Sequence, residues 1–399
     1  MRKMKDSGVE WIGEIPYEWE MRRLRFLCNI TTGNMDTQNN NPDGEYPFYV
    51  RSPIVERSDE YTFDNEAVLM AGDGVGAGKV FHYVNGKYGC HQRVYSMSGF
   101  QDISGKYLYY YLLENFYKKM EESNAKSTVD SVRLPMLKDF FVVFPNCFEQ
   151  EAIVQYLDSK CLNIDGIIAC QEEIITKIKE YKTSLYSEQI ANCFGKEIAF
   201  GKVIESVEQG WSPSSSDQKD DNGWSVLTLA AVKYGQFDAD ETKEFAGDQD
   251  KCKRLVLRDG DFLLTRSNTR ELVGQVCIVE NVKENTIFSD LIYRINFNLE
   301  YIDPQYALYY FQSPQMRQQI SRDAHGSSSS MVKITHKNIS NWTVVLPSIE
   351  TQKEIVSILK QKEKAILNEI AKRECLIKKL IEYKKSLIYE VVTGKKEVL

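Results

Sequence analysis

Two stretches of the chain, 202 residues apart, carry apolar residues at the spacing of a long amphipathic helix. In each stretch the apolar positions are separated by steps of 4, 7, 4, 7, 3 and 7 residues, a mean period between 3.5 and 3.6. This period favours two helices that pair as a gently left-handed, antiparallel coiled coil. A helix of about forty residues is about 60 Å long. The positions are Ile153, Leu157, Ile164, Ile168, Ile175, Ile178 and Leu185, and then Ile355, Leu359, Ile366, Ile370, Ile377, Leu380 and Leu387.

The helical stretches belong to a longer internal repeat. Phe144–Tyr186 aligns on Leu346–Ile388 without a gap, and a segment of about 150 residues precedes each copy. If the two helices were only surface helices of ordinary domains, their apolar positions would not need the same spacing in both copies. Because the copies of a repeat do similar jobs, we predict two globular modules held apart by two helices, in a protein that recognises two sites at a fixed separation. Matching landmarks are Pro145 with Pro347, Gln150 with Gln352, and Glu180-Tyr181-Lys182 with Glu382-Tyr383-Lys384.

Shorter patterns predict an α+β fold for each module. Alternating apolar residues indicate strands, and the tyrosine-rich runs Tyr107–Leu112 and Tyr306–Phe311 indicate short helices. The expected boundaries are 1–148 for the first module, 149–194 for the first helix, 195–346 for the second module and 347–399 for the second helix. The predicted strands are Lys79–Val84, Phe141–Pro145, Val276–Val279, Ile292–Phe297 and Thr343–Pro347.

The loops of the two modules differ more than their scaffolds. Three segments rich in Asn, Asp, Gly or Ser stand out: Thr32–Tyr46, Gln209–Gly223 and His325–Ser330. Segments of this composition are also typical of ordinary linkers. Loops on a shared scaffold are, however, where binding residues concentrate, so we expect these three to contact a partner.

Composition is that of a globular protein with room for two or three domains: 399 residues, 42% hydrophobic and 12% aromatic. No apolar run reaches the roughly 20 residues that span a bilayer, and the N-terminus lacks the apolar core of a signal peptide. We therefore expect a cytoplasmic protein. The nine cysteines are scattered without a Cys-x-x-Cys pair, which predicts buried, reduced thiols and neither disulfides nor a zinc site.

The net charge of −7 argues at first against nucleic acid. Residues 149–194 hold 4 basic and 8 acidic residues, a net charge of −4, whereas 350–399 hold 12 and 8, a net charge of +4. Opposite charges favour pairing of the two helices with each other, although exposed ion pairs contribute little. Neither module is basic, so binding DNA would require local basic patches or a partner that supplies charge.

The motifs of known enzymes are missing. Gly72–Lys79 resembles a phosphate-binding loop, but the glycine and the hydroxyl residue that the motif requires are replaced by Asp73 and Val80. The four histidines (82, 91, 325 and 336) have no metal-ligand spacing. No HExxH, Gly-x-Ser-x-Gly or Asn-Pro-Pro-Tyr element occurs. We predict no catalytic residue and no metal; an enzyme with an unrecognised site stays an alternative, which predicts turnover by the isolated chain.

Several segments, in order along the whole chain, resemble the specificity (S) subunit of type I restriction–modification systems. The N-terminal Gly8–Pro16 with Trp19 and Arg22-Arg23-Leu24 is similar to the signature of that family. Further similar segments are the turn Gly72–Val80, the helix starts Glu149–Asp158 and Thr351–Leu359, and the C-terminal Ser386–Lys395.

This resemblance implies a function. Each module would be a target-recognition domain for one half of a bipartite, asymmetric site in double-stranded DNA. The helices would set the spacer and dock two methyltransferase subunits. Cofactors would lie on the partners, S-adenosylmethionine on the methyltransferase and ATP with Mg²⁺ on restriction subunits where these join, and none on this chain. The competing interpretation is a coiled-coil scaffold that binds only protein.

Candidates for DNA contact follow from the chemistry of base edges and phosphates. Arg suits guanine, Asn and Gln suit adenine, and Lys and Arg also bind phosphates. The densest group is Thr265–Arg270, at the position that corresponds to the Gly-rich turn of the first module, where a buried role for both arginines is a poor explanation. The candidates are Arg51, Lys79, His91, Gln92, Arg93, Lys126, Ser127 and Arg133 in the first module, and Ser212, Ser214, Arg266, Asn268, Arg270, Ser328, Lys333, His336 and Lys337 in the second.

Overall fold

The computed structural model describes residues 2–123, 131–191, 194–212, 223–245, 249–328 and 331–398. By contacts it divides into two compact units. Unit 1 combines Met1–Gln171 with Glu374–Leu399, and unit 2 is Glu172–Arg373. Each unit therefore contains one module together with part of both long helices.

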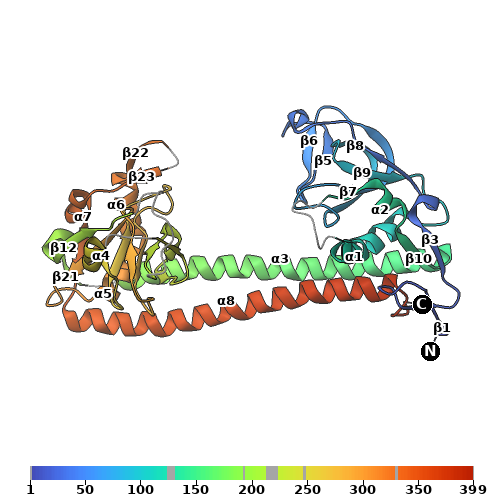
Figure 1. The fold of residues 1–399 in the computed structure, drawn as a ribbon. Helices are drawn as coiled ribbons and strands as arrows, with labels where there is room; N and C mark the ends of the chain where they lie inside the picture. Colours follow the sequence, from blue (N-terminus) through green and yellow to red (C-terminus); the bar gives the residue numbers. More distant parts are fainter. Residues whose placement is uncertain are drawn as a thin grey trace. The chain divides into compact units, whose positions relative to one another are not determined.

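The two long helices of the repeat are α3, Cys147–Ala191, and α8, Ile349–Val392 (Figure 1). Unit 1 takes the first part of α3 and the last part of α8, and unit 2 takes the other two parts. Ten of the fourteen predicted seam residues are buried, and the other four, Ile168, Ile178, Ile377 and Leu380, are half-buried. The apolar period therefore identifies the face that each helix buries.

The module of unit 1 is built on a six-stranded sheet in the order β4-β9-β7-β8-β5-β6, in which only β5 and β8 pair in parallel. The sheet strands are β4 (Asn29–Thr32), β5 (Tyr46–Tyr49), β6 (Glu56–Ser58), β7 (Phe63–Ala71), β8 (Phe81–Cys90) and β9 (Val94–Ser98). Around it lie the pair β1 (Met4–Asp6) and β2 (Glu14–Pro16), the pair β3 (Glu20–Arg23) and β10 (Phe141–Phe144), and the helices α1 (Gly105–Ser123) and α2 (Leu134–Lys138).

The module of unit 2 has a smaller central sheet in the order β12-β21-β17-β19: Ile204–Gln209, Ile292–Phe297, Phe262–Thr265 and Val276–Ile278. Short sheets surround it: β11 (Lys196–Ala199) with β24 (Thr343–Leu346); β16 (Thr242–Glu244), β13 (Ser225–Leu227) and β20 (Thr286–Phe288); β14 (Val232–Lys233) with β15 (Gln236–Phe237); and β18 (Ser267–Asn268), β23 (Met331–Lys333) and β22 (His325–Ser328). The helices are α4 (Gln249–Leu255), α5 (Pro304–Phe311), α6 (Pro314–Asp323) and α7 (His336–Asn341).

The predicted α+β class is confirmed, and the expected strands and short helices agree with the observed bounds within two residues at each end, except for β8 and α1. The strand expected over Lys79–Val84 begins only at Phe81, because Gly78 N–H returns to the Ala71 carbonyl (3.0 Å) and closes a turn before it. The helix expected over Tyr107–Leu112 extends over Gly105–Ser123.

One glutamine in each unit shows the repeat at atomic detail. Gln150 Oε1 accepts from Ser104 N–H (2.7 Å), and its Nε2 donates to the carbonyls of Asp102 (3.0 Å) and Pro145 (2.9 Å). In unit 2 the equivalent glutamine, Gln352, makes the same three bonds, to Asp303 N–H (2.8 Å), Tyr301 O (2.9 Å) and Pro347 O (3.0 Å). Both side chains are buried. Each ties the start of a long helix to the segment before a tyrosine-rich helix.

Eight cysteines lie in the described part of the chain and all are free thiols. The expectation that they are buried is wrong for Cys147, Cys170 and Cys375, which are exposed on the long helices. Burial raises the pKa of the Cys28 thiol to about 12. Among the described residues, no helix has the length and apolar character that a membrane span needs.

Candidate nucleic-acid interface

The two modules share a backbone framework around the turn after β7 in unit 1 and after β17 in unit 2. In unit 1, Gly72 N–H donates to Arg93 O (2.9 Å), and Gly72 O accepts from Val132 N–H (2.8 Å). In unit 2, Arg266 makes the same two bonds, to Leu291 O (2.8 Å) and from Ile334 N–H (3.0 Å). Gly72 and Arg266 therefore occupy equivalent backbone positions.

A second shared contact places the first variable loop of each module. Gly33 N–H donates to Val94 O (3.3 Å), and Gly210 N–H donates to Ile292 O (3.2 Å). A Cβ at Gly33 would overlap the Cys90 carbonyl, and one at Gly210 would overlap the Phe288 carbonyl. Only glycine permits this approach, so the loops that begin at Thr32 and Gln209 leave their modules at equivalent points.

In unit 1 the structure brings four of the predicted DNA-contacting residues together with two carboxylates. Arg51 Nη1 lies 3.0 Å from Asp73 Oδ1, and Arg93 Nη1 lies 3.4 Å from Asp73 Oδ2. Gln92 Nε2 donates to Asp36 Oδ2 (3.4 Å). These residues come from the end of β5, the turn after β7, the β8–β9 turn and the loop after β4. We call Arg51, Asp73, His91, Gln92, Arg93 and Asp36 the unit 1 polar cluster.

His91 is the buried member of this cluster, with 3% of its surface exposed. Its Nδ1 accepts from Arg93 N–H (3.0 Å), and its Nε2 lies 3.7 Å from Asp36 Oδ1. Burial, and then the positive charge of Arg51, lowers the pKa of the imidazole. His91 is therefore neutral at pH 7 and shapes the β8–β9 turn, while Arg51 and Arg93 face solvent.

The other candidates of unit 1 surround this cluster less closely. Lys79 ends the Gly-rich turn, and its ammonium lies 4.5 Å from the ring centroid of Tyr117 on α1. Arg133 is exposed and caps the start of α2 without a side-chain hydrogen bond to the helix. Lys126 and Ser127 lie outside the described residues.

In unit 2, Arg266 is half-buried, which corrects the expectation that no buried role exists for it. Its guanidinium lies 5.6 Å from the ring centroid of Tyr293, and its Nη1 donates to the Asp290 carbonyl (3.3 Å). Ser212 Oγ, another candidate, bonds the same aspartate, accepting from Asp290 N–H (3.3 Å). Arg270 is exposed, as predicted.

The remaining candidates of unit 2 follow the small sheet β18-β23-β22. Lys333 on β23 is exposed and pairs in register with Ser267. His336 and Lys337 are the exposed first residues of α7, Asn268 lies on β18, and Ser328 lies on β22. Ser214 lies outside the described residues. Sequence reasoning missed Asp36, Asp73 and Asp290, because a carboxylate is not an expected ligand of DNA.

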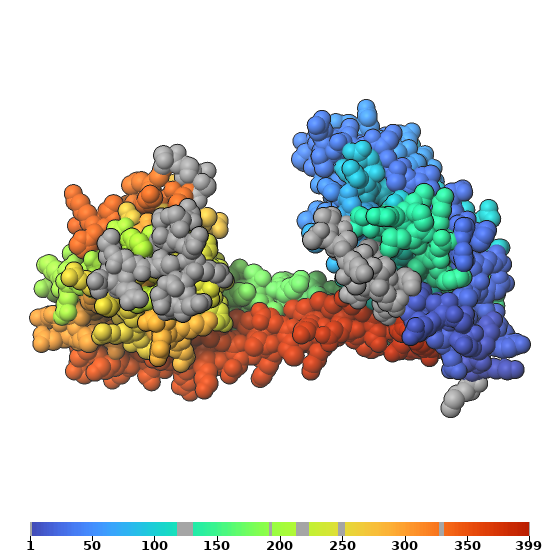
Figure 2. Space-filling model, viewed as in Figure 1, coloured from blue at the N-terminus to red at the C-terminus, as the bar shows by residue number. Residues whose placement is uncertain are grey.

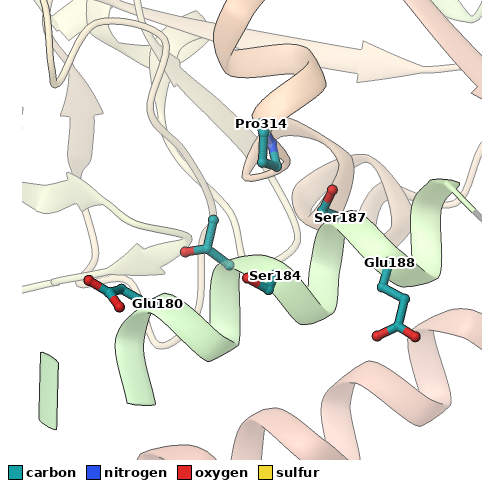
Figure 3. Close-up of a pocket in the computed structure, with 6 residues that line it drawn as sticks. Glu180, Ser184, Ser187, Glu188 and Pro314 are labelled. Atoms are coloured by element: carbon teal, nitrogen blue, oxygen red, sulfur yellow. The ribbon is translucent and has the colours of Figure 1, made fainter. Parts of the chain in front are cut away.

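A hollow of about 480 Å³ on unit 2 lies between α3 and the start of α6 (Figure 3). Two carboxylates, Glu180 and Glu188, line it with Thr183, Ser184, Ser187 and Pro314. Negative charge makes it unsuitable for a phosphate backbone. The described part of the chain also contains no group of three or more His, Cys, Asp or Glu that would hold a metal ion.

Comparison with known proteins gives matches in both halves of the chain. The family model for the type I restriction modification DNA specificity domain matches residues 16–180 and residues 196–374. The type I restriction enzyme EcoDI specificity subunit of Escherichia coli is 30% identical over 173 residues, which are 43% of this chain and 38% of that protein. The EcoBI specificity subunit of E. coli is 22% identical over 301 residues, 68% of this chain and 61% of that protein. Both alignments span less than two thirds of the relative.

The fold also matches a solved structure from work on complex assembly and conformational transition of the type I R-M system. The TM-score is 0.69, and the match covers 96% of this chain and 99% of that chain at 15% identity. At this identity the match shows likeness of fold.

Proposed function

The chain belongs to the family of type I restriction modification DNA specificity domains, and on this premise we propose that it is the non-catalytic subunit that recognises a bipartite, asymmetric DNA site for a methyltransferase complex. The observation that carries the proposal is the common backbone framework with unlike side chains. Gly72 and Arg266 are equivalent in their hydrogen bonds, as are Arg93 and Leu291. Each base pair presents its own pattern of donors and acceptors in the major groove. Two frameworks with different side chains are therefore suited to two different half-sites.

The acidic total charge fits a complex in which partners share the phosphate contacts. Phosphate binding depends on basic side chains, yet this chain has a net charge of −7. In unit 1 Asp73 lies beside Arg51 and Arg93, and Asp36 lies beside Gln92, which suits selective contact with bases better than general attraction to DNA. The methyltransferase subunits would then supply much of the positive surface around the duplex.

The long helices are suited to the roles of spacer and dock. They contain 45 and 44 residues, about 66 Å of helix at ~1.5 Å per residue. Tyr181 and Tyr383, at matched positions of the repeat, are 57% and 54% exposed. The lysine after each one is held within its own unit, Lys182 by Glu363 (2.7 Å) and Lys384 by Asp165 (2.6 Å).

An exposed tyrosine in both copies of a repeat suits two copies of one partner, because aromatic side chains are common anchors of protein interfaces. α8 also keeps exposed side chains along its length (Figure 2). We infer that the partners are two methyltransferase subunits. S-adenosylmethionine, and ATP with Mg²⁺ where restriction subunits join, would be bound by those partners.

Methylation mapping in cells tests the proposal. Cells that carry this chain and its partner methyltransferase are sequenced for N6-methyladenine, with and without the gene for this chain. We expect a bipartite motif that disappears with the deletion. Replacing residues 1–148 by the module of a relative should change one half of the motif and leave the other half. An active methyltransferase without any dependent motif would contradict the proposal.

The scaffold that binds only protein predicts a different result. The assembled complex of this chain with its methyltransferase would then have no more affinity for duplex DNA containing the motif than for DNA of random sequence. A mobility-shift titration with both duplexes, at one stated salt concentration, separates the two functions because nonspecific binding depends strongly on salt.

A further inference from the structure

One carboxylate in unit 1 holds two arginines. Asp73 Oδ1 lies 3.0 Å from Arg51 Nη1, and its Oδ2 lies 3.4 Å from Arg93 Nη1. The aspartate side chain is 23% exposed, and the arginine side chains are 45% and 63% exposed. Within the described residues, neither guanidinium has another hydrogen-bonding partner. Each arginine therefore keeps most of its donors free while one terminal nitrogen is held.

The backbone of Asp73 is fixed by the fold. It forms an isolated antiparallel bridge with Ser131, next to the bond from Val132 N–H to Gly72 O (2.8 Å). The following residue, Gly74, has φ +74°, a left-handed conformation that lets the chain turn away at once. An added Cβ at Gly74 would lie 3.8 Å from Arg51 Nη1. The carboxylate is thus a rigid point at which side chains from two other loops meet.

The attraction between Asp73 and the two arginines does not by itself explain why a carboxylate lies at a surface proposed to bind DNA. Exposed ion pairs contribute little to stability, and a negative charge beside DNA repels phosphates. Its benefit lies in orientation, because an arginine that is already held loses less conformational entropy when it binds. A guanidinium held at one nitrogen can present its remaining donors to guanine O6 and N7, the commonest specific contact of arginine in the major groove.

We propose that Asp73 is a positioning residue that orients Arg51 and Arg93 for guanine recognition, so that the half-site recognised by unit 1 contains guanine. This inference rests on the proposed function and names the base chemistry of one half. Unit 2 has no carboxylate at the equivalent position. Its equivalent of Asp73 is Ser267, since Ser267 pairs with Lys333 as Asp73 pairs with Ser131. The effect of losing Asp73 is therefore confined to one half-site.

The test measures base preference at every position of both half-sites in cells that contain the partner methyltransferase. Asp73→Asn keeps the size of the side chain but replaces one acceptor by a donor, which frees one arginine. We expect a loss of about tenfold in the preference for guanine at one or two positions of the unit 1 half-site. Arg51→Ala and Arg93→Ala should relax the same positions. Asp64→Asn is the matched control, because Asp64 is exposed at the other end of β7.

Undiminished recognition of the other half-site shows that each variant is folded and assembled. Should Asp73→Asn fail this criterion, Arg93→Lys gives the decision, since lysine keeps the charge but lacks the planar pair of donors that a guanidinium presents to guanine. The inference is overturned if the unit 1 half-site contains no guanine, or if Asp73→Asn (or Arg93→Lys in its place) leaves preferences intact or lowers methylation uniformly. Absence of any bipartite motif with the unaltered chain would instead overturn the proposed function.

Discussion

At the scale of single residues, the position of the first variable loop in each module depends on a glycine. Gly33 and Gly210 pass so close to the carbonyls of Cys90 and Phe288 that no side chain fits. The loops on either side are free to vary because this contact uses only backbone atoms. In contrast, Gly166 on α3 has no neighbouring atom within 4 Å of an added Cβ.

These two environments predict opposite effects of alanine. Gly33→Ala should lower the free energy of unfolding by about 1–3 kcal/mol, the usual cost of overpacking. Gly166→Ala, the control within unit 1, should raise it by up to about 1 kcal/mol because alanine favours the helix. Urea unfolding of the intact chain measures both. A neutral Gly33→Ala would mean that the β4 end moves away from Cys90 without cost.

A second prediction at this scale concerns the arginines of unit 2. Arg266 is held against Tyr293, whereas Arg270 is exposed. The double variant Arg266→Ala with Arg270→Ala should change recognition only in the half-site of unit 2, by about 1–3 kcal/mol if base contacts are lost. Methylation at sites with altered half-sites measures the change. Equal loss at unrelated half-sites would identify both arginines as phosphate contacts.

At the scale of elements, one carboxylate on α8 joins three side chains in unit 2. Glu363 accepts from Tyr186 (2.6 Å) on α3 and from Tyr309 (3.0 Å) on α5, and it pairs with Lys182 (2.7 Å) on α3. Burial raises the pKa of Glu363, but Lys182 and the two tyrosines outweigh burial, so the net pKa lies below its ordinary value. This carboxylate ties α3, α5 and α8 together.

The depressed pKa sets the sign of a pH effect. A carboxylate with a lowered folded pKa stabilises the fold above its unfolded pKa, near 4.5, and this stabilisation is lost as the pH falls through the folded value. Glu363→Gln should therefore lower stability at pH 7 by about 1–3 kcal/mol and flatten the loss of stability in acid.

Thermal unfolding of the variant and the unaltered chain between neutral pH and pH 3 checks this. Glu173→Gln, which removes an exposed partner of Lys177, is the matched control and should behave as the unaltered chain does. Parallel pH profiles for Glu363→Gln and the unaltered chain would show that the carboxylate contributes nothing specific.

At the scale of the whole molecule, the repeat extends from backbone contacts inside each unit to matched side chains on the long helices. Gln150 and Gln352 make the same three bonds. The interhelical ion pairs follow the repeat in part: the matched lysines Lys182 and Lys384 each pair with a carboxylate of the other helix, but these carboxylates, Glu363 and Asp165, are not at matched positions. The opposite net charges of the helices therefore do not decide every contact between them.

If Tyr181 and Tyr383 each belong to the docking surface for one methyltransferase subunit, the complex should contain two such subunits. Tyr181→Ala and Tyr383→Ala should each reduce the number of bound methyltransferase subunits from two to one, and the double variant should bind neither. Native mass spectrometry of the reconstituted complex counts the subunits. Tyr301→Ala, at a similarly exposed tyrosine outside both helices, is the control; an unchanged count for the double variant would place the docking surface elsewhere.

The sequence by itself determined the repeat, the seams of the long helices and the α+β class. Each of these depends on local spacing, because backbone hydrogen bonding gives helices and strands their periods wherever they lie. The carbonyls of Cys90 and Phe288, which require glycine at positions 33 and 210, lie far along the chain, and no local pattern indicates them.

Only the tertiary structure decided which polar side chains meet. Asp73 lies 22 residues from Arg51 and 20 from Arg93, and Glu363 lies 181 residues from Lys182. Such pairs depend on strand register and on packing between elements, which no local period encodes. Arg266 illustrates the same limit, since its sequence context suggested a free donor and the fold placed it against Tyr293. The apolar spacing of the sequence identified which faces of the helices are buried. Tertiary packing determined which polar side chains contact each other.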